Sequence, residues 1–221
     1  MWTSSKIKKH IAQLEKGQIF TTRDLLEYGL RNTVDQTLSR LARSGLIIRL
    51  ARGVFTRNDF QKTLPTAFEV ARAKASAFKK VIVQCGQNAW AALGLPETER
   101  RGADSSGSAS ATYAISGNSS RFWYGDLLIE FIGIAQRKLV LGDSKPGLAL
   151  RVLWELKKDG CTQKMFDLVT SKLTPKEMKQ LRKVAAVMPH WLSDLCLEKF
   201  RDPPPITPQP PDWIESLVRR P

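Results

Sequence analysis

The first 60 residues alternate between segments with the hydrophobic spacing of helices and short segments typical of strands. Apolar positions recur every three or four residues over 5–16, which predicts an amphipathic helix. Ile19-Phe20 follows as a very short strand. Thr21-Thr22-Arg23-Asp24 matches the capping signature of a helix start, and it opens a second helix over 23–28. The connections between these predicted elements are only a few residues long.

A third helix and a two-strand hairpin complete this pattern. Asn32 is a good N-cap for the helix, and Asp35 lies in its first turn, where a negative charge is favourable. A hairpin over 47–55 follows, with Gly53 suited to its tight tip. The inward stripe of the third helix is Val34, Leu38, Leu41 and Ala42. This order predicts a winged helix–turn–helix, whose second motif helix lies in the DNA major groove.

The polar side of the third helix and the basic residues around it are the candidate DNA contacts. Gln and Arg pair bidentately with adenine and guanine edges, and Thr can contact a thymine methyl group. Arginines of a wing neutralise phosphates or enter the minor groove. Lysines of the first helix can hold the backbone. The predicted DNA-binding residues are Lys8, Lys9, Arg31, Thr33, Gln36, Thr37, Arg40, Arg43, Arg49 and Arg52.

Beyond residue 60 the pattern becomes mixed. The predicted elements are a helix over 63–80, a strand over 81–85, a helix over 87–93, and strands over 111–116, 121–124 and 127–132. Gly125-Asp126 joins the last two strands as a tight hairpin. From Pro146 onward apolar stripes at helical spacing predict helices, one of them opened by the capping box Thr174–Glu177.

The chain is therefore expected to be an α+β protein of three parts. A winged helix–turn–helix occupies 1–60, and a mixed α/β domain with a small antiparallel sheet and a C-terminal helical part occupies 61–200. A Pro-rich tail over 201–221 follows, with six prolines between residues 203 and 211.

The charge points to a polyanionic partner. The formal net charge is +14 over 221 residues, and it is densest in the first 60. Such an excess favours nucleic acid or an anionic membrane surface. Membrane insertion is not expected, because no apolar run approaches the roughly 18 residues of a spanning helix. The charged first helix follows Met1 with no apolar signal region, so we expect a cytoplasmic protein.

Residues that could carry other chemistry are few. Cys85, Cys161 and Cys196 are expected to be reduced core thiols, and His190 to be structural. There is no phosphate-binding glycine loop, paired metal-ligand spacing or nucleophile elbow, so no enzyme, cofactor or metal is predicted. Asp126 and Glu130 are expected to face solvent.

The tryptophans leave one alternative open. Trp90, Trp123 and Trp154 are best interpreted as core residues. The Phe122-Trp123-Tyr124 stretch beside Arg121 would also suit a surface on which bases stack.

Several of these segments resemble a known family. Thr21–Tyr28, Val34–Leu41 and Leu50–Phe55 look like the N-terminal domain of AbiEi-type antitoxins. The likeness continues through Asn88–Leu95 and Tyr113–Ile132, and so covers most of residues 5–200, with the tail outside it.

The resemblance implies a bacterial antitoxin from a toxin–antitoxin or phage-defence operon. Its N-terminal domain would bind double-stranded DNA at inverted repeats in its own promoter and repress transcription. Its second domain would counteract a nucleotidyltransferase-type toxin without forming a stable complex. A stand-alone transcriptional regulator of a mobile element, a toxin-sequestering interaction module and an RNA-binding protein stay open as alternatives.

Overall fold

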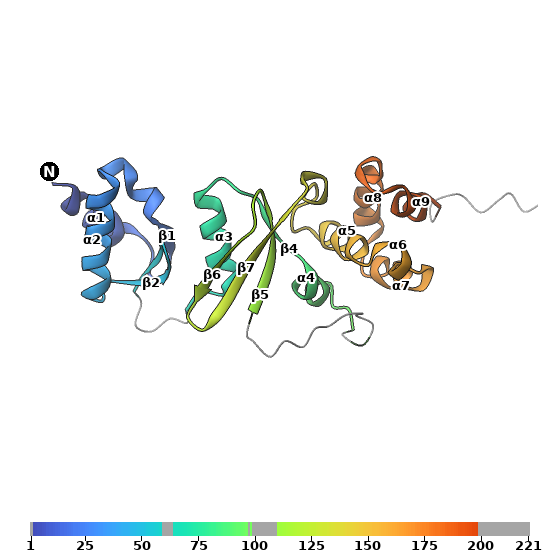
Figure 1. Cartoon of the computed structure of the whole chain (residues 1–221), viewed down its shortest axis with the longest axis horizontal. Helices are drawn as coiled ribbons and strands as arrows, with labels where there is room; N and C mark the ends of the chain where they lie inside the picture. Colours follow the sequence, from blue (N-terminus) through green and yellow to red (C-terminus); the bar gives the residue numbers. More distant parts are fainter. Residues whose placement is uncertain (1, 59–63, 97, 99–109, 199–221) are drawn as a thin grey trace, which may run out of the picture.

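The computed structural model describes residues 2–58, 64–96, 98 and 110–198, and it shows an elongated α+β protein (Figure 1). Three groups of elements follow one another along the long axis: an N-terminal unit, a central sheet with a helix against it, and C-terminal helices. The expected α+β class is confirmed. The predicted tail over 201–221 lies outside the described residues. None of the described helices is long and apolar enough to cross a membrane.

The N-terminal unit, residues 2–58, folds around one small core. Its elements are α1 (Thr3–Gln13), β1 (Ile19–Thr21), the 3₁₀ helix η1 (Thr22–Tyr28), α2 (Arg31–Arg43), β2 (Ile47–Ala51) and β3 (Val54–Arg57). The strands form an antiparallel sheet in the order β1-β3-β2. The core joins Ile7 of α1, Leu25 of η1 and Leu38 of α2. The rings of Phe20 and Phe55 stack between β1 and β3, with centroids 5.9 Å apart.

Local signals set the ends of these elements as predicted, with one exception. The backbone N–H of Thr21 donates to Asp24 Oδ2 at 2.8 Å, which is the expected capping contact at the start of η1. Gly53, in the turn between β2 and β3, has a φ of +77°, a conformation that favours glycine. The expectation that Asn32 caps α2 is wrong. The helix begins at Arg31, two residues earlier than a cap at Asn32 implies, and the extended Leu30 is its N-cap residue.

The central sheet is mixed rather than antiparallel as expected. It contains β4 (Ile82–Gln84), β5 (Ser110–Ser116), β6 (Ser120–Tyr124) and β7 (Leu127–Ile134), in the order β4-β5-β7-β6. The predicted hairpin at Gly125-Asp126 is confirmed, since Tyr124 pairs with Leu127. This hairpin folds so that β7, rather than β6, lies next to β5. The pairing of β5 with β7 is therefore parallel.

The two faces of the central sheet have different surroundings. On one face, Tyr113 and Phe131 pack with Ala71 of α3 (Ala67–Ala77). On edge strand β6 only Phe122 and Tyr124 belong to that packed side. Trp123 points to the opposite face and is 59 % exposed, so the expectation that it lies in the core is wrong. Successive residues of a strand face opposite sides of the sheet, so the register of β6 decides which side Trp123 faces. Aromatic composition does not reveal this register.

The largest core of the described residues joins a helix that precedes β5 to the helices that follow β7. Its helices are α4 (Gly86–Ala92), α5 (Lys145–Glu155), α7 (Gln163–Thr170), α8 (Pro175–Lys183) and α9 (His190–Glu198). The shorter elements of this part are η3 (Gln136–Lys138), α6 (Lys157–Gly160) and η4 (Ala185–Val187). Trp90 and Trp154 are buried there, as predicted. The capping box at Thr174 is also confirmed, since Glu177 Oε2 accepts from the Thr174 backbone N–H at 2.8 Å.

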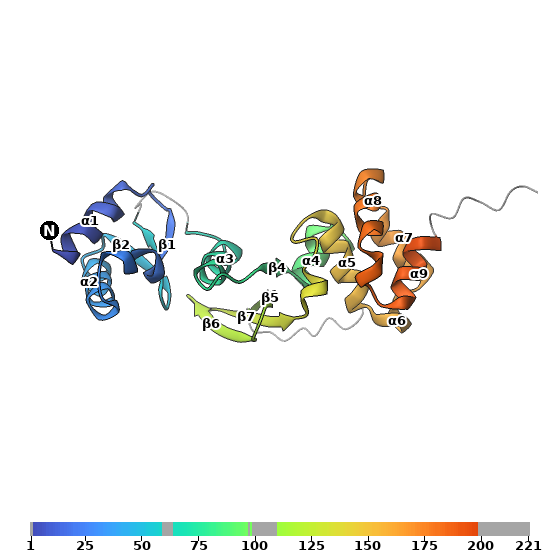
Figure 2. The ribbon, with the colours of Figure 1, turned by 90° about the horizontal axis from the view of Figure 1, so that it is seen from above.

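The N-terminal unit rests on the central part through its sheet. Leu50 and Val54 cluster with Val70 of α3. Lys74 Nζ donates to the carbonyl of Arg52 at 2.9 Å, and Arg23 Nη1 donates to the carbonyl of Ala77 at 2.6 Å. Viewed from above, α1 and α2 lie at the end of the molecule away from these contacts (Figure 2). The contacts therefore leave α2 facing solvent.

Candidate nucleic-acid interface

A groove lies between α2 and the β2–β3 hairpin, and we call it the arginine groove. Its volume is about 350 Å³. Arg31 and Arg43 line it from α2, and Arg49 and Arg52 line it from the hairpin. All four side chains are exposed. Two separate elements thus bring predicted DNA-binding residues to one hollow, with Asp35 as the carboxylate among its lining residues.

Other predicted residues are exposed but lie outside the arginine groove. Successive residues of a helix are about 100° apart, so one helix cannot direct all of its polar residues at the same hollow. Thr33, Gln36 and Arg40 are exposed on α2, and Lys8 and Lys9 are exposed on α1. The structure therefore divides the predicted set into residues that line the arginine groove and residues that surround it.

Thr37 is a correction. The sequence interpretation placed it on the outward face of the helix, but the residue is only 5 % exposed. Its hydroxyl donates to the carbonyl of Thr33 one turn earlier, at 2.8 Å. The rotation of α2 about its axis turns this position toward the core beside Val34 and Leu38, so Thr37 cannot reach a base edge.

One ion pair crosses the first turn of α2. Arg31 Nε lies 2.9 Å from Asp35 Oδ2, and both side chains are about half exposed, at 62 % and 47 %. Exposed pairs with this spacing contribute only about 0.3–0.5 kcal/mol. Arg31 can therefore exchange this carboxylate for a phosphate at little cost.

Lys74 is a residue that sequence reasoning missed. Burial lowers its pKa, and the nearby charges of Arg52 and Arg49 lower it further. The charges of Lys74, Arg49 and Arg52 are therefore close enough to influence one another, although Lys74 belongs to α3. The sequence pattern of α3 does not predict that Lys74 lies near the arginine groove, because its contact with the carbonyl of Arg52 joins residues 22 positions apart.

Thr22 was also missed. It is 4 % exposed, lines the arginine groove, and its Oγ1 has no hydrogen-bond partner among the described residues. Buried hydroxyls are nearly always satisfied, so such an atom calls for a partner. The sequence interpretation saw Thr22 only as part of a capping signature.

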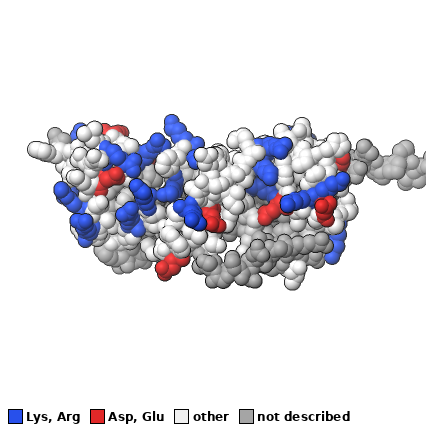
Figure 3. Space-filling view, in the orientation of Figure 1, with Lys and Arg blue, Asp and Glu red and all other residues white. Residues whose placement is uncertain are grey.

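The space-filling view shows a basic surface on the N-terminal part of the molecule (Figure 3). Lys and Arg side chains gather over the N-terminal part of the molecule, with few acidic side chains among them (Figure 3). The charge density expected from the sequence thus corresponds to a surface in space.

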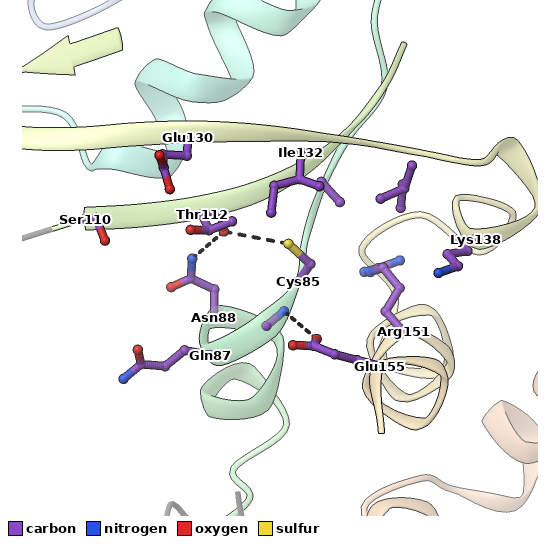
Figure 4. Close-up of a pocket in the computed structure, with 13 residues that line it drawn as sticks. Cys85, Gln87, Asn88, Ser110, Thr112, Glu130, Ile132, Lys138, Arg151 and Glu155 are labelled. Carbon is purple, nitrogen blue, oxygen red and sulfur yellow. Dashed lines mark hydrogen bonds between the residues drawn. The ribbon is translucent and has the colours of Figure 1, made fainter. Parts of the chain in front are cut away.

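A second hollow lies on the face of the central sheet opposite α3, and we call it the sheet pocket (Figure 4). Its volume is about 550 Å³. Glu130 of β7 is half-buried and lines it, so the expectation that this residue faces solvent is wrong. Register explains the difference, because β7 lies between two strands and Glu130 pairs with Thr112, which lines the pocket too. Asp126 is exposed as expected.

Arg151 of α5 anchors the sheet pocket. It is 4 % exposed and donates through Nε to the carbonyl of Gln84 at 2.6 Å and through Nη1 to that of Gly142 at 2.7 Å. Its Nη2 donates to Asp143 Oδ1 at 3.2 Å. Burial lowers the pKa of Arg151, and the carboxylate of Asp143 opposes this change. These bonds tie β4, α5 and the loop before α5 together.

Cys85 also lines the sheet pocket, as a neutral thiol. Burial, followed by the charge of Glu155, raises its pKa to about 11. The thiolate is the reactive form of cysteine, so Cys85 is unsuited to nucleophilic chemistry at neutral pH. Cys161 and Cys196 are buried, as expected of core thiols, and none of the three forms a disulfide. The described residues hold no group of three or more His, Cys, Asp or Glu side chains that could bind a metal.

His190 is not part of either hollow. Its side chain is 93 % exposed, and Nδ1 lies 2.7 Å from Asp194 Oδ2 within α9. This contact stays within one turn of α9, so the described residues show no role for His190 beyond its own helix.

Fold and sites together define a mixed α+β protein with a basic N-terminal unit and a polar pocket on its central sheet. The chain belongs to the family DUF6088, described as a family of unknown function, whose model matches residues 6–181. Comparison with curated proteins and with solved structures gave no match. The likeness to AbiEi-type antitoxins stays a prediction, since the family description gives no activity.

Proposed function

We propose that this protein binds double-stranded DNA sequence-specifically and that its N-terminal unit is a winged helix–turn–helix. The order α1-β1-η1-α2, followed by the β2–β3 hairpin, supports this. In this proposal α2 is the recognition helix and the hairpin is the wing. The observation that carries the proposal is the arginine groove, in which two elements present four exposed arginines at the free end of the molecule.

Each part of this surface has a distinct role in the proposal. Gln36 and Arg40, exposed on α2, read base edges in the major groove. Arg49 and Arg52 of the hairpin neutralise phosphates. Lys8 and Lys9 on α1 would hold the backbone alongside.

Repression of its own operon and antitoxin activity are further proposals that rest on the AbiEi resemblance. Binding at inverted repeats in its promoter would give the repression. Counteracting a nucleotidyltransferase-type toxin would be the task of the part beyond the N-terminal unit. Neither the arginine groove nor the sheet pocket adds support for the toxin, so DNA binding is the function to test first.

The experiment is a fluorescence-anisotropy titration of two duplexes, the DNA upstream of the gene and a scrambled copy. Gln36→Ala should weaken binding to the upstream duplex by about 1–3 kcal/mol, roughly 5- to 150-fold, and leave the scrambled duplex nearly unaffected. Arg52→Ala should weaken both duplexes alike, because phosphates carry no sequence information.

Gln180→Ala is the matched control, since Gln180 is an exposed glutamine of α8 far from the arginine groove. It should change neither affinity. Equal losses on both duplexes for Gln36→Ala would remove the base-reading role of α2. Tighter binding to an RNA hairpin than to either duplex would overturn the proposal as a whole.

A further inference from the structure

We propose that the sheet pocket binds a free mononucleotide, with its phosphate beside Lys138 and Arg151 and its base toward Glu130 and Trp123. This goes beyond the DNA-binding function, because the sheet pocket and the arginine groove share no lining residue. A volume of about 550 Å³ is within the range of small-molecule sites, roughly 300–1,000 Å³.

The end of the sheet pocket near α5 can receive an anion. A guanidinium has five N–H donors, and Arg151 uses three of its own on Gln84, Gly142 and Asp143. Among the described residues the other two donors have no partner, and Arg151, which is 4 % exposed, lines the pocket. Lys138 also lines this end, as Figure 4 shows, and its ammonium lies 5.0 Å from the ring centre of Trp154. Glu155 of α5 lines this end as well, but its Oε2 accepts from the backbone N–H of Gly86 at 3.0 Å, so this carboxylate is directed at α4. Lys138 and the remaining donors of Arg151 are the groups that can bind a phosphate here.

The lining residues at the other end are hydrogen-bonding groups rather than cations. Glu130, Thr112 and Ser110 lie there on adjacent strands (Figure 4). Asn88 directs its amide N–H to the carbonyl of Thr112 at 2.9 Å, which leaves its Oδ1 as an acceptor. Carboxylate and amide oxygens accept from the exocyclic amino group of a base, and hydroxyls can donate to its ring nitrogens.

An apolar surface lies between and beside these ends. Ala114, Ile132 and Ile134 line the middle of the sheet pocket. Trp123 pairs with Leu128, which itself pairs with Ser110, so the indole lies on the pocket face of the sheet at its edge. It is 59 % exposed. Glu130 itself pairs with Arg121, and Trp123 is its diagonal neighbour on the same face, within reach of a base that extends past Glu130 toward the sheet edge. Stacking on an aromatic ring contributes about 1–3 kcal/mol.

The test is calorimetric titration of the full chain with the 5′-monophosphates of adenosine, guanosine, cytidine and uridine. Inorganic phosphate and the four nucleosides serve as reference ligands. At least one monophosphate should bind about 10- to 100-fold more tightly than its nucleoside, as expected for charge-assisted hydrogen bonds to phosphate. Absence of heat and of thermal stabilisation with all four monophosphates at millimolar concentration would overturn the proposal.

Two pocket variants locate the ligand. Lys138→Met keeps the alkyl stem against Trp154 and should remove most of the preference for the monophosphate over the nucleoside. Glu130→Gln should weaken monophosphate and nucleoside by the same factor, because it acts on the base. Lys172→Met, at an exposed lysine after α7, is the matched control and should change nothing.

A further variant separates this site from the DNA surface. Arg52→Ala should leave the monophosphate affinity unchanged, even if it weakens DNA binding. Loss of monophosphate binding in Arg52→Ala but not in Lys138→Met would place the nucleotide in the arginine groove and overturn the proposal. Binding of a single-stranded oligonucleotide with no affinity for any monophosphate would overturn it as well.

Discussion

The arginine groove and the sheet pocket are both polar hollows, but they are built in opposite ways. The arginine groove is lined by four exposed arginines against one carboxylate, and the Arg31–Asp35 pair is itself solvent-exposed. The sheet pocket has two cations and two carboxylates, and Arg151 is fixed by three protein acceptors. A polyanion can be bound by charge density alone. A small ligand needs groups held in place, so only the second hollow is expected to depend on individual contacts.

The largest effect should come from removing Arg151. In Arg151→Met the carbonyls of Gln84 and Gly142 and the Asp143 carboxylate lose their donor. Breaking a buried pair by removing one partner costs about 3–5 kcal/mol in the free energy of unfolding. Urea denaturation followed by circular dichroism measures this loss.

Arg43→Met is the control from the other hollow. Arg43 is exposed and lines the arginine groove, so this change should stay within about 0.5 kcal/mol. Similar losses of stability in the two variants would show that the hollows do not differ in rigidity as proposed.

Arg151 also shows what the sequence could and could not predict of the fold. Capping at Thr21 and Thr174 and the turn at Gly125 were predicted correctly, because each depends on residues within four positions. The acceptor carbonyl of Gln84 lies 67 positions from Arg151, and no local pattern connects them. The mixed sheet was mispredicted for the same reason, since the place of β7 beside β5 is decided by long-range packing.

The same difference between local and long-range contacts explains which parts of the candidate sites were predicted. The arginines of α2 and of the hairpin were predicted because the elements that carry them are adjacent in sequence. Lys74 and the whole sheet pocket were missed, since they are assembled from distant segments. Thr37 and Trp123 were misplaced by a rotation of their elements, which hydrophobic spacing determines only coarsely.

The second prediction uses salt to separate the two hollows. With about five phosphate contacts, log Kd for DNA should rise with log salt with a slope of roughly 4–5, or about 500-fold between 50 and 200 mM. Binding of a mononucleotide in the sheet pocket should weaken less than about tenfold over that range, because one phosphate is neutralised. Arg52→Ala should lower the DNA slope by about 1. Anisotropy and calorimetry at four salt concentrations measure both slopes, and a DNA slope near zero would contradict a phosphate-binding role for the arginine groove.

The smallest effect is expected at Thr37, and it tests how α2 faces DNA. Thr37 is buried, and its hydroxyl bonds only within its own helix, to the carbonyl of Thr33. Thr37→Val keeps the shape of the side chain, so DNA affinity should stay within about twofold and stability within about 1 kcal/mol. Gln36, the next residue back, is exposed, and Gln36→Ala should lose roughly 5- to 150-fold on the upstream duplex. Anisotropy titrations of the two neighbours side by side measure the contrast. If Thr37→Val lost as much DNA affinity as Gln36→Ala while its unfolding free energy stayed unchanged, α2 would have to turn about its axis on binding, and the surface described here would not be the one that meets DNA.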